Sequence, residues 1–147
     1  MRNILLGIII LASTALIKPA HAADSCAPSG STQGEQAKCY AARVERFSHH
    51  AHQYARSFSD WNDSAQQQAV YALWNLSRFA SAYKRRVEKN ITTFETTKAL
   101  FGDTVTRYHM AYGESQFLDG VTQMQVRNWL WQVRSDLSKL SKLYPKQ

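Results

Sequence analysis

Apolar residues recur at alternating steps of three and four along this 147-residue chain, and this spacing constrains its fold more than any other feature. At about 100° per residue, such steps place the side chains along one face of an α-helix. The first run comprises Ala37, Tyr40, Val44, Phe47, Ala51, Tyr54, Phe58 and Trp61. Because no stretch alternates apolar and polar residues as a half-buried strand does, the sequence predicts an all-α fold.

Three further runs have the same spacing. They comprise Ala69, Leu73, Leu76, Ala80, Tyr83 and Val87 in the second, Val105, Tyr108 and Tyr112 in the third, and Val126, Leu130, Val133, Leu137, Leu140 and Tyr144 in the last. Asp63 and Asp103 suit the N-caps of the second and third helices, and Pro145 suits the end of the last. The poor helix formers between Asn90 and Thr97 predict a bend or break there.

These runs predict helices near 34–59, 64–90 (or on to 101), 103–118 and 121–144. About four amphipathic helices with short connections indicate an antiparallel bundle. Sustained heptads also suit a coiled-coil homodimer, which is the alternative. The short first connection favours packing within one chain.

The N-terminus has the pattern of a secretory leader. Arg2 precedes an apolar stretch, residues 4–17, that is shorter than the roughly 20 residues a membrane-spanning helix needs. Ala20-His21-Ala22 then supplies the small-x-small pattern that signal peptidase reads. We therefore expect a bacterial signal peptide, residues 1–22, cleaved near Ala22. Residues 23–147 then form a single helical domain that is periplasmic or secreted.

Cys26 and Cys39 are the only cysteines. An even number of cysteines in an exported chain predicts a disulfide bond. The bond would tie residues 23–36 to the start of the first helix, and closing so short a loop stabilises a fold by about 2–3 kcal/mol.

Two helix faces carry aromatic and arginine residues that the apolar runs do not use. These are Tyr71, Trp74, Arg78 and Arg85 on the second helix, and Arg127, Trp131 and Arg134 on the last. Such residue types dominate the binding energy of protein interfaces, so both faces are candidate binding surfaces. The alternative is that Trp74 and Trp131 form a second buried face. The formal net charge is +7, and removing Arg2 and Lys18 leaves +5, which favours anionic neighbours.

Glu45, His49 and His52 follow the spacing i, i+4 and i+7, which places them on the polar face of the first helix. Their oxygen and nitrogen donors could approach one Zn²⁺ or Cu²⁺ ion. A single helix face seldom completes a four-ligand site, so the simpler interpretation is three solvent-exposed polar residues and no cofactor.

The sequence contains no H-E-x-x-H, G-x-S-x-G or glycine-rich phosphate loop, and we expect no enzyme. We expect an exported helical protein that binds another exported or envelope protein, one with an acidic surface. Two classes of protein match this description: an immunity or inhibitor protein, and an accessory factor of a secretion or conjugation system. One alternative is a cationic protein at the envelope or an anionic membrane surface, and a second is a metal-binding helical protein. Nucleic acid is an unsuitable partner for an exported chain.

Overall fold

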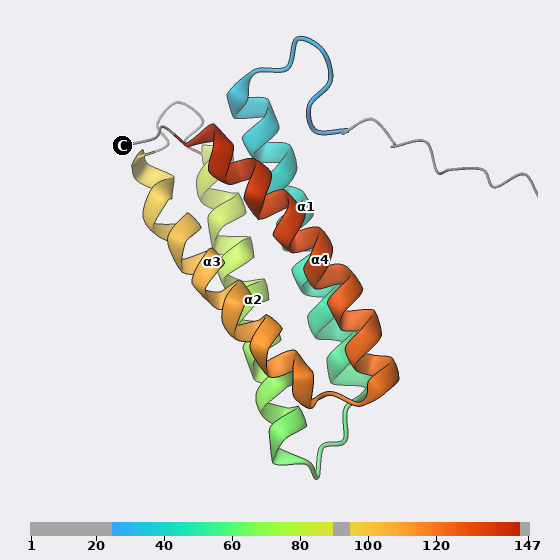
Figure 1. Cartoon of the computed structure of the whole chain (residues 1–147). Helices are drawn as coiled ribbons and strands as arrows, with labels where there is room; N and C mark the ends of the chain where they lie inside the picture. Colours follow the sequence, from blue (N-terminus) through green and yellow to red (C-terminus); the bar gives the residue numbers. More distant parts are fainter. Residues whose placement is uncertain (1–24, 90–94, 145–147) are drawn as a thin grey trace, which may run out of the picture.

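The described part of the chain, residues 25–89 and 95–144 of a computed structural model, contains four α-helices and no strand (Figure 1). The helices are α1 (Gln33–Phe58), α2 (Ser64–Lys89), α3 (Glu95–Glu114) and α4 (Gly120–Leu143), and a short 3-10 turn, η1 (Ser115–Phe117), precedes α4. Consecutive helices run in opposite directions, which confirms the predicted antiparallel bundle. The predicted signal peptide, residues 1–22, lies outside the described residues.

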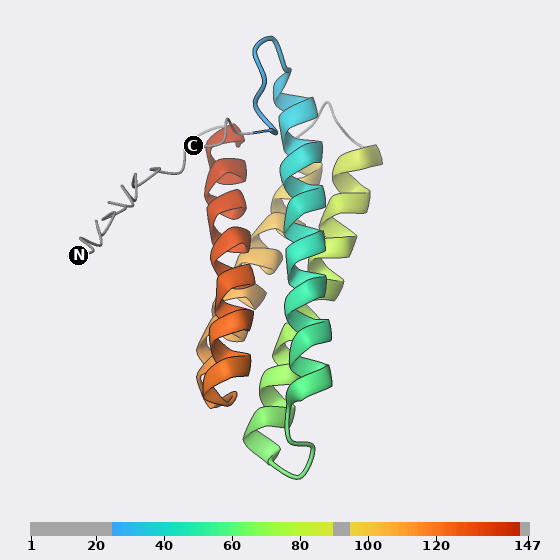
Figure 2. The ribbon, with the colours of Figure 1, turned by 90° about the vertical axis from the view of Figure 1, so that its right-hand side faces the viewer.

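The four helices do not contact one another equally. α1 packs along its length against both α4 and α2, and α2 also packs against α3. Figure 2 shows α1 and α4 running side by side. In contrast, α3 and α4 make only sparse contacts. The bundle is therefore closely packed on three sides and open between α3 and α4.

The core contains the residues that the spacing predicted for α2 and α4. Buried residues of these runs are Ala69, Leu73, Leu76, Ala80, Tyr83, Val87, Val126, Leu130, Val133, Leu137 and Leu140. The Tyr83 hydroxyl lies 2.9 Å from that of Tyr144, which in turn lies 2.7 Å from the Thr97 hydroxyl. This chain of hydroxyl groups links α2, α4 and α3 at one end of the core.

The predicted buried face of the first helix is too long. Phe58 and Trp61 are 59% and 52% exposed, although the spacing placed both in the buried run. α1 ends at Phe58, and Trp61 belongs to the loop before α2. Tyr112 near the end of α3 is also exposed. In each case the three-four spacing continues beyond the point where a neighbouring helix covers the residue.

Helix α3 begins at Glu95, eight residues before the predicted start at 103. Asp103 lies inside the helix, so its prediction as an N-cap is wrong. A single helix from 64 to 101 is wrong as well, because α2 and α3 pack against each other. The predicted bend falls largely on residues 90–94, which are outside the described residues. Thr104 on the buried face donates its hydroxyl to the Leu100 carbonyl at 2.7 Å, which satisfies that group within the helix.

Helix starts are capped by side chains where the sequence offers acceptors. Asp63 Oδ1 accepts hydrogen bonds from the backbone N–H groups of Ala65 and Gln66, at 2.8 and 3.3 Å, which confirms Asp63 as an N-cap. At the start of α1, Thr32 Oγ1 accepts from the Glu35 N–H, and Glu35 accepts from the Thr32 N–H at 2.7 Å. This reciprocal pair is a capping box.

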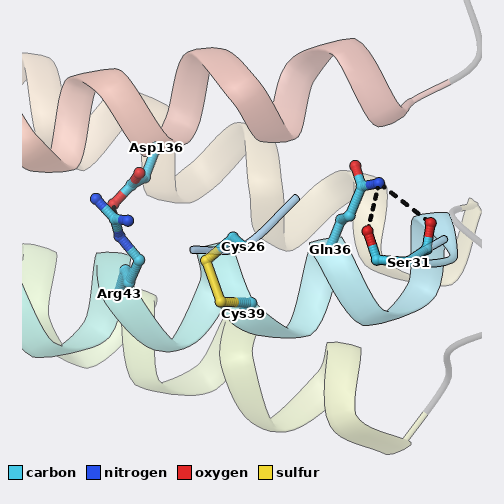
Figure 3. Close-up of a disulfide and its surroundings, with 6 residues drawn as sticks. All are labelled: Cys26, Ser31, Gln36, Cys39, Arg43 and Asp136. Carbon is cyan, nitrogen blue, oxygen red and sulfur yellow. Dashed lines mark hydrogen bonds and ion pairs between the residues drawn. A yellow bond between two sulfur atoms is a disulfide. The ribbon is translucent and has the colours of Figure 1, made fainter. Parts of the chain in front are cut away.

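The predicted disulfide is present. Cys26 and Cys39 are bonded, with their Cα atoms 5.4 Å apart, and Cys26 is buried against α1 (Figure 3). The Gln36 side chain also donates to Ser31, which holds the same segment to the first turn of α1. Disulfides of this kind form in oxidising compartments. Among the described helices, none has both the length and the apolar character to cross a membrane.

Candidate binding groove between α1 and α2

A groove follows the outer face where α1 meets α2. It consists of two hollows of about 620 and 420 Å³ that share His52 and Trp74. We call this surface the α1–α2 groove and define it by His49, His52, Arg56, Trp61, Tyr71, Trp74, Arg78 and Arg85. The structure thus brings the predicted histidines of the first helix and the predicted aromatic and arginine face of the second helix to one place.

The groove is basic. Arg56, Arg78 and Arg85 line it, and none of its lining residues is an aspartate or a glutamate. The nearby Glu45 is engaged elsewhere, because its carboxylate lies 2.8 Å from Lys84 Nζ and accepts a 2.9 Å hydrogen bond from Ser81. Partial burial opposes ionisation of Glu45, but these two hydrogen bonds, with the positive charges of Lys84 and Arg85, outweigh it and hold the pKa of its carboxyl below the usual value. Arg85 shares in the charge interaction with Glu45, and Arg56 and Arg78 are the groove arginines best placed to meet an anionic ligand.

Aromatic side chains form the apolar part of the groove. The Arg78 guanidinium carbon lies 4.7 Å from the centroid of the Trp74 ring, and the Tyr71 ring lies 5.4 Å from the same ring. The first contact is a cation–π interaction, which orients both side chains. Trp74 is half-buried and Tyr71 is exposed, so Trp74 is intermediate between the surface and core alternatives. An apolar ligand group can therefore contact aromatic rings between positive charges.

His52 lies at the junction of the two hollows. Burial lowers the pKa of His52, and the neighbouring His49 and Arg56 lower it further. The ring is therefore neutral at pH 7 and gains a proton only in more acidic solution. Acidification adds positive charge to an already basic groove.

Glu45, His49 and His52 do not converge on a metal position. Among residues 25–89 and 95–144, no group of three histidine, cysteine, aspartate or glutamate side chains is placed to hold a metal ion. Glu45 interacts with α2 through Lys84 and Ser81, whereas the two histidines line the groove. The three residues lie on one face of α1, as predicted, but the imidazoles of His49 and His52 line the groove.

The second predicted face, on α4, lies away from the α1–α2 groove. Arg127 Nε donates to Ser115 Oγ at 3.3 Å, and its guanidinium lies over the Tyr112 ring, so this arginine joins α4 to the end of α3. Trp131 is 62% exposed, and Arg134 is exposed beside α3. The two faces are therefore separate surfaces.

Two groove residues, Arg56 and Trp61, were not predicted as site residues. Arg56 follows His49 and His52 at the spacing i, i+3 and i+7, so helical periodicity alone could have included it. Trp61 carried no such signal, because its position depends on the loop, where the Gln67 side chain donates to the Trp61 carbonyl. Comparison with protein-family models, with curated proteins and with solved structures found no match to this chain.

Proposed function

We propose that this protein acts by binding another protein, and that it recognises an acidic segment with an aromatic or apolar side chain through the α1–α2 groove. The observation that carries the proposal is the composition of the groove: three arginines and two histidines surround aromatic rings, with no carboxylate among the lining residues. Carboxylates of the partner would form charge-assisted hydrogen bonds with the arginines, and the apolar side chain would pack on Trp74.

We also propose that the protein is exported to the periplasm or secreted, after removal of residues 1–22. The leader pattern and the Cys26–Cys39 disulfide support this location. An immunity or inhibitor protein and an accessory factor of a secretion or conjugation system remain the two functional classes that suit an exported binding bundle. Mass spectrometry of the protein from its native source tests the location, since the expected mature chain begins at Ala23.

Affinity capture with matched variants tests the binding surface. The mature protein is immobilised and exposed to envelope extract or growth medium of its source, and captured proteins are identified by mass spectrometry. We expect Trp74→Ala and Arg78→Gln each to weaken the affinity for the captured partner by tenfold or more, with unchanged helicity by circular dichroism. Trp131→Ala is the matched control, because it removes an exposed tryptophan outside the groove.

The opposite pattern would contradict the groove assignment. If Trp131→Ala or Arg134→Ala abolishes capture while Trp74→Ala and Arg78→Gln bind normally, the partner uses the α4 face. If all four variants bind normally, neither predicted face is the interface.

A second candidate function is binding to an anionic membrane surface through α4. Val121, Met124 and Trp131 are all more than half exposed and follow one another at helical spacing on the outer face of this helix. Apolar residues beside arginines suit an interfacial position. Co-sedimentation with anionic vesicles at low salt tests this candidate, and binding that is lost in Trp131→Ala but retained in Trp74→Ala would support it.

A further inference from the structure

The sparse packing between α3 and α4 leaves a second groove, which we call the α3–α4 groove. Its volume is about 290 Å³, and the residues that define it are Phe101, Val105, Tyr108, His109, Arg134 and Leu137. It belongs to the two helices that take no part in the α1–α2 groove, and both lie towards the viewer in Figure 1. Neither the proposed protein-binding function nor the α1–α2 groove uses these residues, and only Arg134 belongs to a predicted binding face, the one on α4.

The floor of the α3–α4 groove is apolar and continuous with the core. Tyr108 and Leu137 are buried, and Phe101 and Val105 are half-buried against the same core. At one end the Phe101 ring stacks on the Tyr144 ring, with centroids 4.8 Å apart. Aromatic rings therefore border that end of the groove.

The other end of the groove is cationic. α3 and α4 are antiparallel, so His109 and Arg134 lie together at this end. His109 is eight residues from Phe101 along α3, and Arg134 is seven residues from Ser141 along α4. Arg134 is exposed, and among the described residues no carboxylate pairs with it. No aspartate or glutamate lines the groove. An open apolar groove with aromatic rings at one end and Arg134 at the other complements a molecule with a single anionic head and one apolar tail.

The length of the α3–α4 groove limits the length of the apolar tail that it can hold. Eight residues of α-helix, from Phe101 to His109, span about 12 Å, which matches an extended acyl chain of roughly eight to ten carbons. We propose that the α3–α4 groove binds a medium-chain fatty acid, with its carboxylate on Arg134 and its chain extending towards Phe101. The carboxylate gains a charge-assisted hydrogen bond, and the methylene groups lose contact with water.

Titration of the mature protein with single-chain amphiphiles tests the ligand class. Decanoate and hexanoate are added below the concentrations at which they form micelles and decanol below its solubility limit, and binding is followed by isothermal titration calorimetry. We expect decanoate to bind at least tenfold more tightly than decanol, and each methylene between hexanoate and decanoate to tighten binding by about two- to fourfold. Equal affinities for decanoate and decanol would overturn the proposal, because the cationic end would then contribute nothing.

Variants of groove residues test whether the ligand binds in the α3–α4 groove. Arg134→Gln should weaken decanoate binding by tenfold or more and leave decanol binding unchanged. Val105→Trp should fill the groove and remove binding of both compounds. If that variant fails to fold, Ser138→Trp should block the groove from the exposed side of α4. Arg78→Gln is the matched control, since it removes an arginine of the other groove. Decanoate binding that survives both tryptophan variants would overturn the proposal.

The same variants also test two other possible occupants of the α3–α4 groove, a second copy of the chain and a membrane surface. If size-exclusion chromatography with light scattering shows a dimer that Val105→Trp converts to a monomer, a second copy of the chain covers the groove and the proposal is wrong. If anionic phospholipid vesicles bind in an Arg134-dependent manner and decanoate does not bind, the groove faces a membrane and the proposal is again wrong. Trp74→Ala should leave decanoate binding unchanged, so failure of the proposed protein-binding function would not affect this result.

Discussion

The Arg43 side chain of α1 and the Asp136 side chain of α4 form an ion pair, with Arg43 Nε 2.9 Å from Asp136 Oδ2 (Figure 3). Asp136 is completely buried, whereas the Arg43 side chain is 22% exposed. A buried ion pair of this kind seldom adds net stability relative to apolar residues, but removing one partner is costly. The pair therefore joins one position of α1 to one position of α4, and its net contribution to stability relative to apolar residues is small.

Replacing Arg43 alone should strongly destabilise the fold. Arg43→Met removes a positive partner of a buried carboxylate, and we expect a loss of about 3 kcal/mol in the free energy of unfolding. The double variant Arg43→Met/Asp136→Leu should recover most of that loss. Urea denaturation of both single variants and the double variant gives the coupling energy, and strictly additive losses would show that the two residues do not interact.

Removing the Cys26–Cys39 disulfide should lower stability without changing the bundle. Because the loop is short, we expect Cys26→Ser/Cys39→Ser to reduce the free energy of unfolding by about 2–3 kcal/mol. Thermal denaturation with and without a reducing agent provides the measurement. The parent protein should respond to the reducing agent, and the double variant should not. An unchanged parent melting temperature under fully reducing conditions would contradict the expectation.

The apolar spacing predicted the buried faces of α2 and α4 because most residues that those faces bury, such as Leu73 or Leu130, are hydrophobic. The polar exceptions are Ser77, Thr122 and Asp136. The spacing predicted a third helix but placed its start eight residues too late, because the buried face of α3 includes Thr97 and Thr104. Threonine gives no apolar signal, and it is a poor helix former. The start of α3 therefore could not be placed from the sequence, and Asp103 was wrongly predicted as its N-cap.

The candidate site was predictable within each helix but not between helices. Helical spacing placed His49 with His52, and Trp74 with Arg78, on shared faces. Periodicity cannot give the rotation of α1 relative to α2, which decides that these two faces meet in one groove. It also cannot reveal that Arg127 is engaged by Ser115, because that contact depends on the turn between α3 and α4.

Truncation of a core leucine and of an exposed tryptophan should have very different effects. Leu73 is fully buried, so Leu73→Ala should cost about 2–5 kcal/mol through lost burial and the cavity left behind. Trp131 is mostly exposed, and Trp131→Ala should change stability by no more than about 0.5 kcal/mol. Urea denaturation of the two variants checks both values. A large loss in Trp131→Ala would mean that another copy of the chain or a further segment covers this residue.

Stability should decline as the solution becomes acidic, in part because of His52. Burial, together with His49 and Arg56, lowers the pKa of His52 from its ordinary value of 6.5, so the unfolded chain binds a proton there more readily than the folded protein does. Above pH 6.5 both states are neutral at this position, and His52 has no effect. As the pH falls through 6.5 towards the lower pKa of the folded state, protonation favours unfolding.

Two histidine variants check this dependence. His52→Gln should flatten the decline in stability between about pH 7.5 and 5. His49→Gln should reduce it, since removing the positive charge of a protonated neighbour raises the pKa of His52 in the folded state. Urea midpoints across this range, with an NMR titration of the His52 ring, provide the measurement. An identical pH profile in His52→Gln and the parent protein would contradict the assignment.

The extensive packing of α1 against α4 determines the order in which the molecule can fold. α4 is the last of these four helices to be synthesised, and α1 contacts it through pairs such as Tyr54 with Trp129 and Tyr40 with Lys139. A nascent chain that has completed α1 and α2 has formed only a helical hairpin, with the α4-facing side of α1 still exposed to water. Cooperative folding of the four-helix bundle should therefore wait for the 24-residue α4, and a chain truncated before α4 is complete should be digested more readily by proteases.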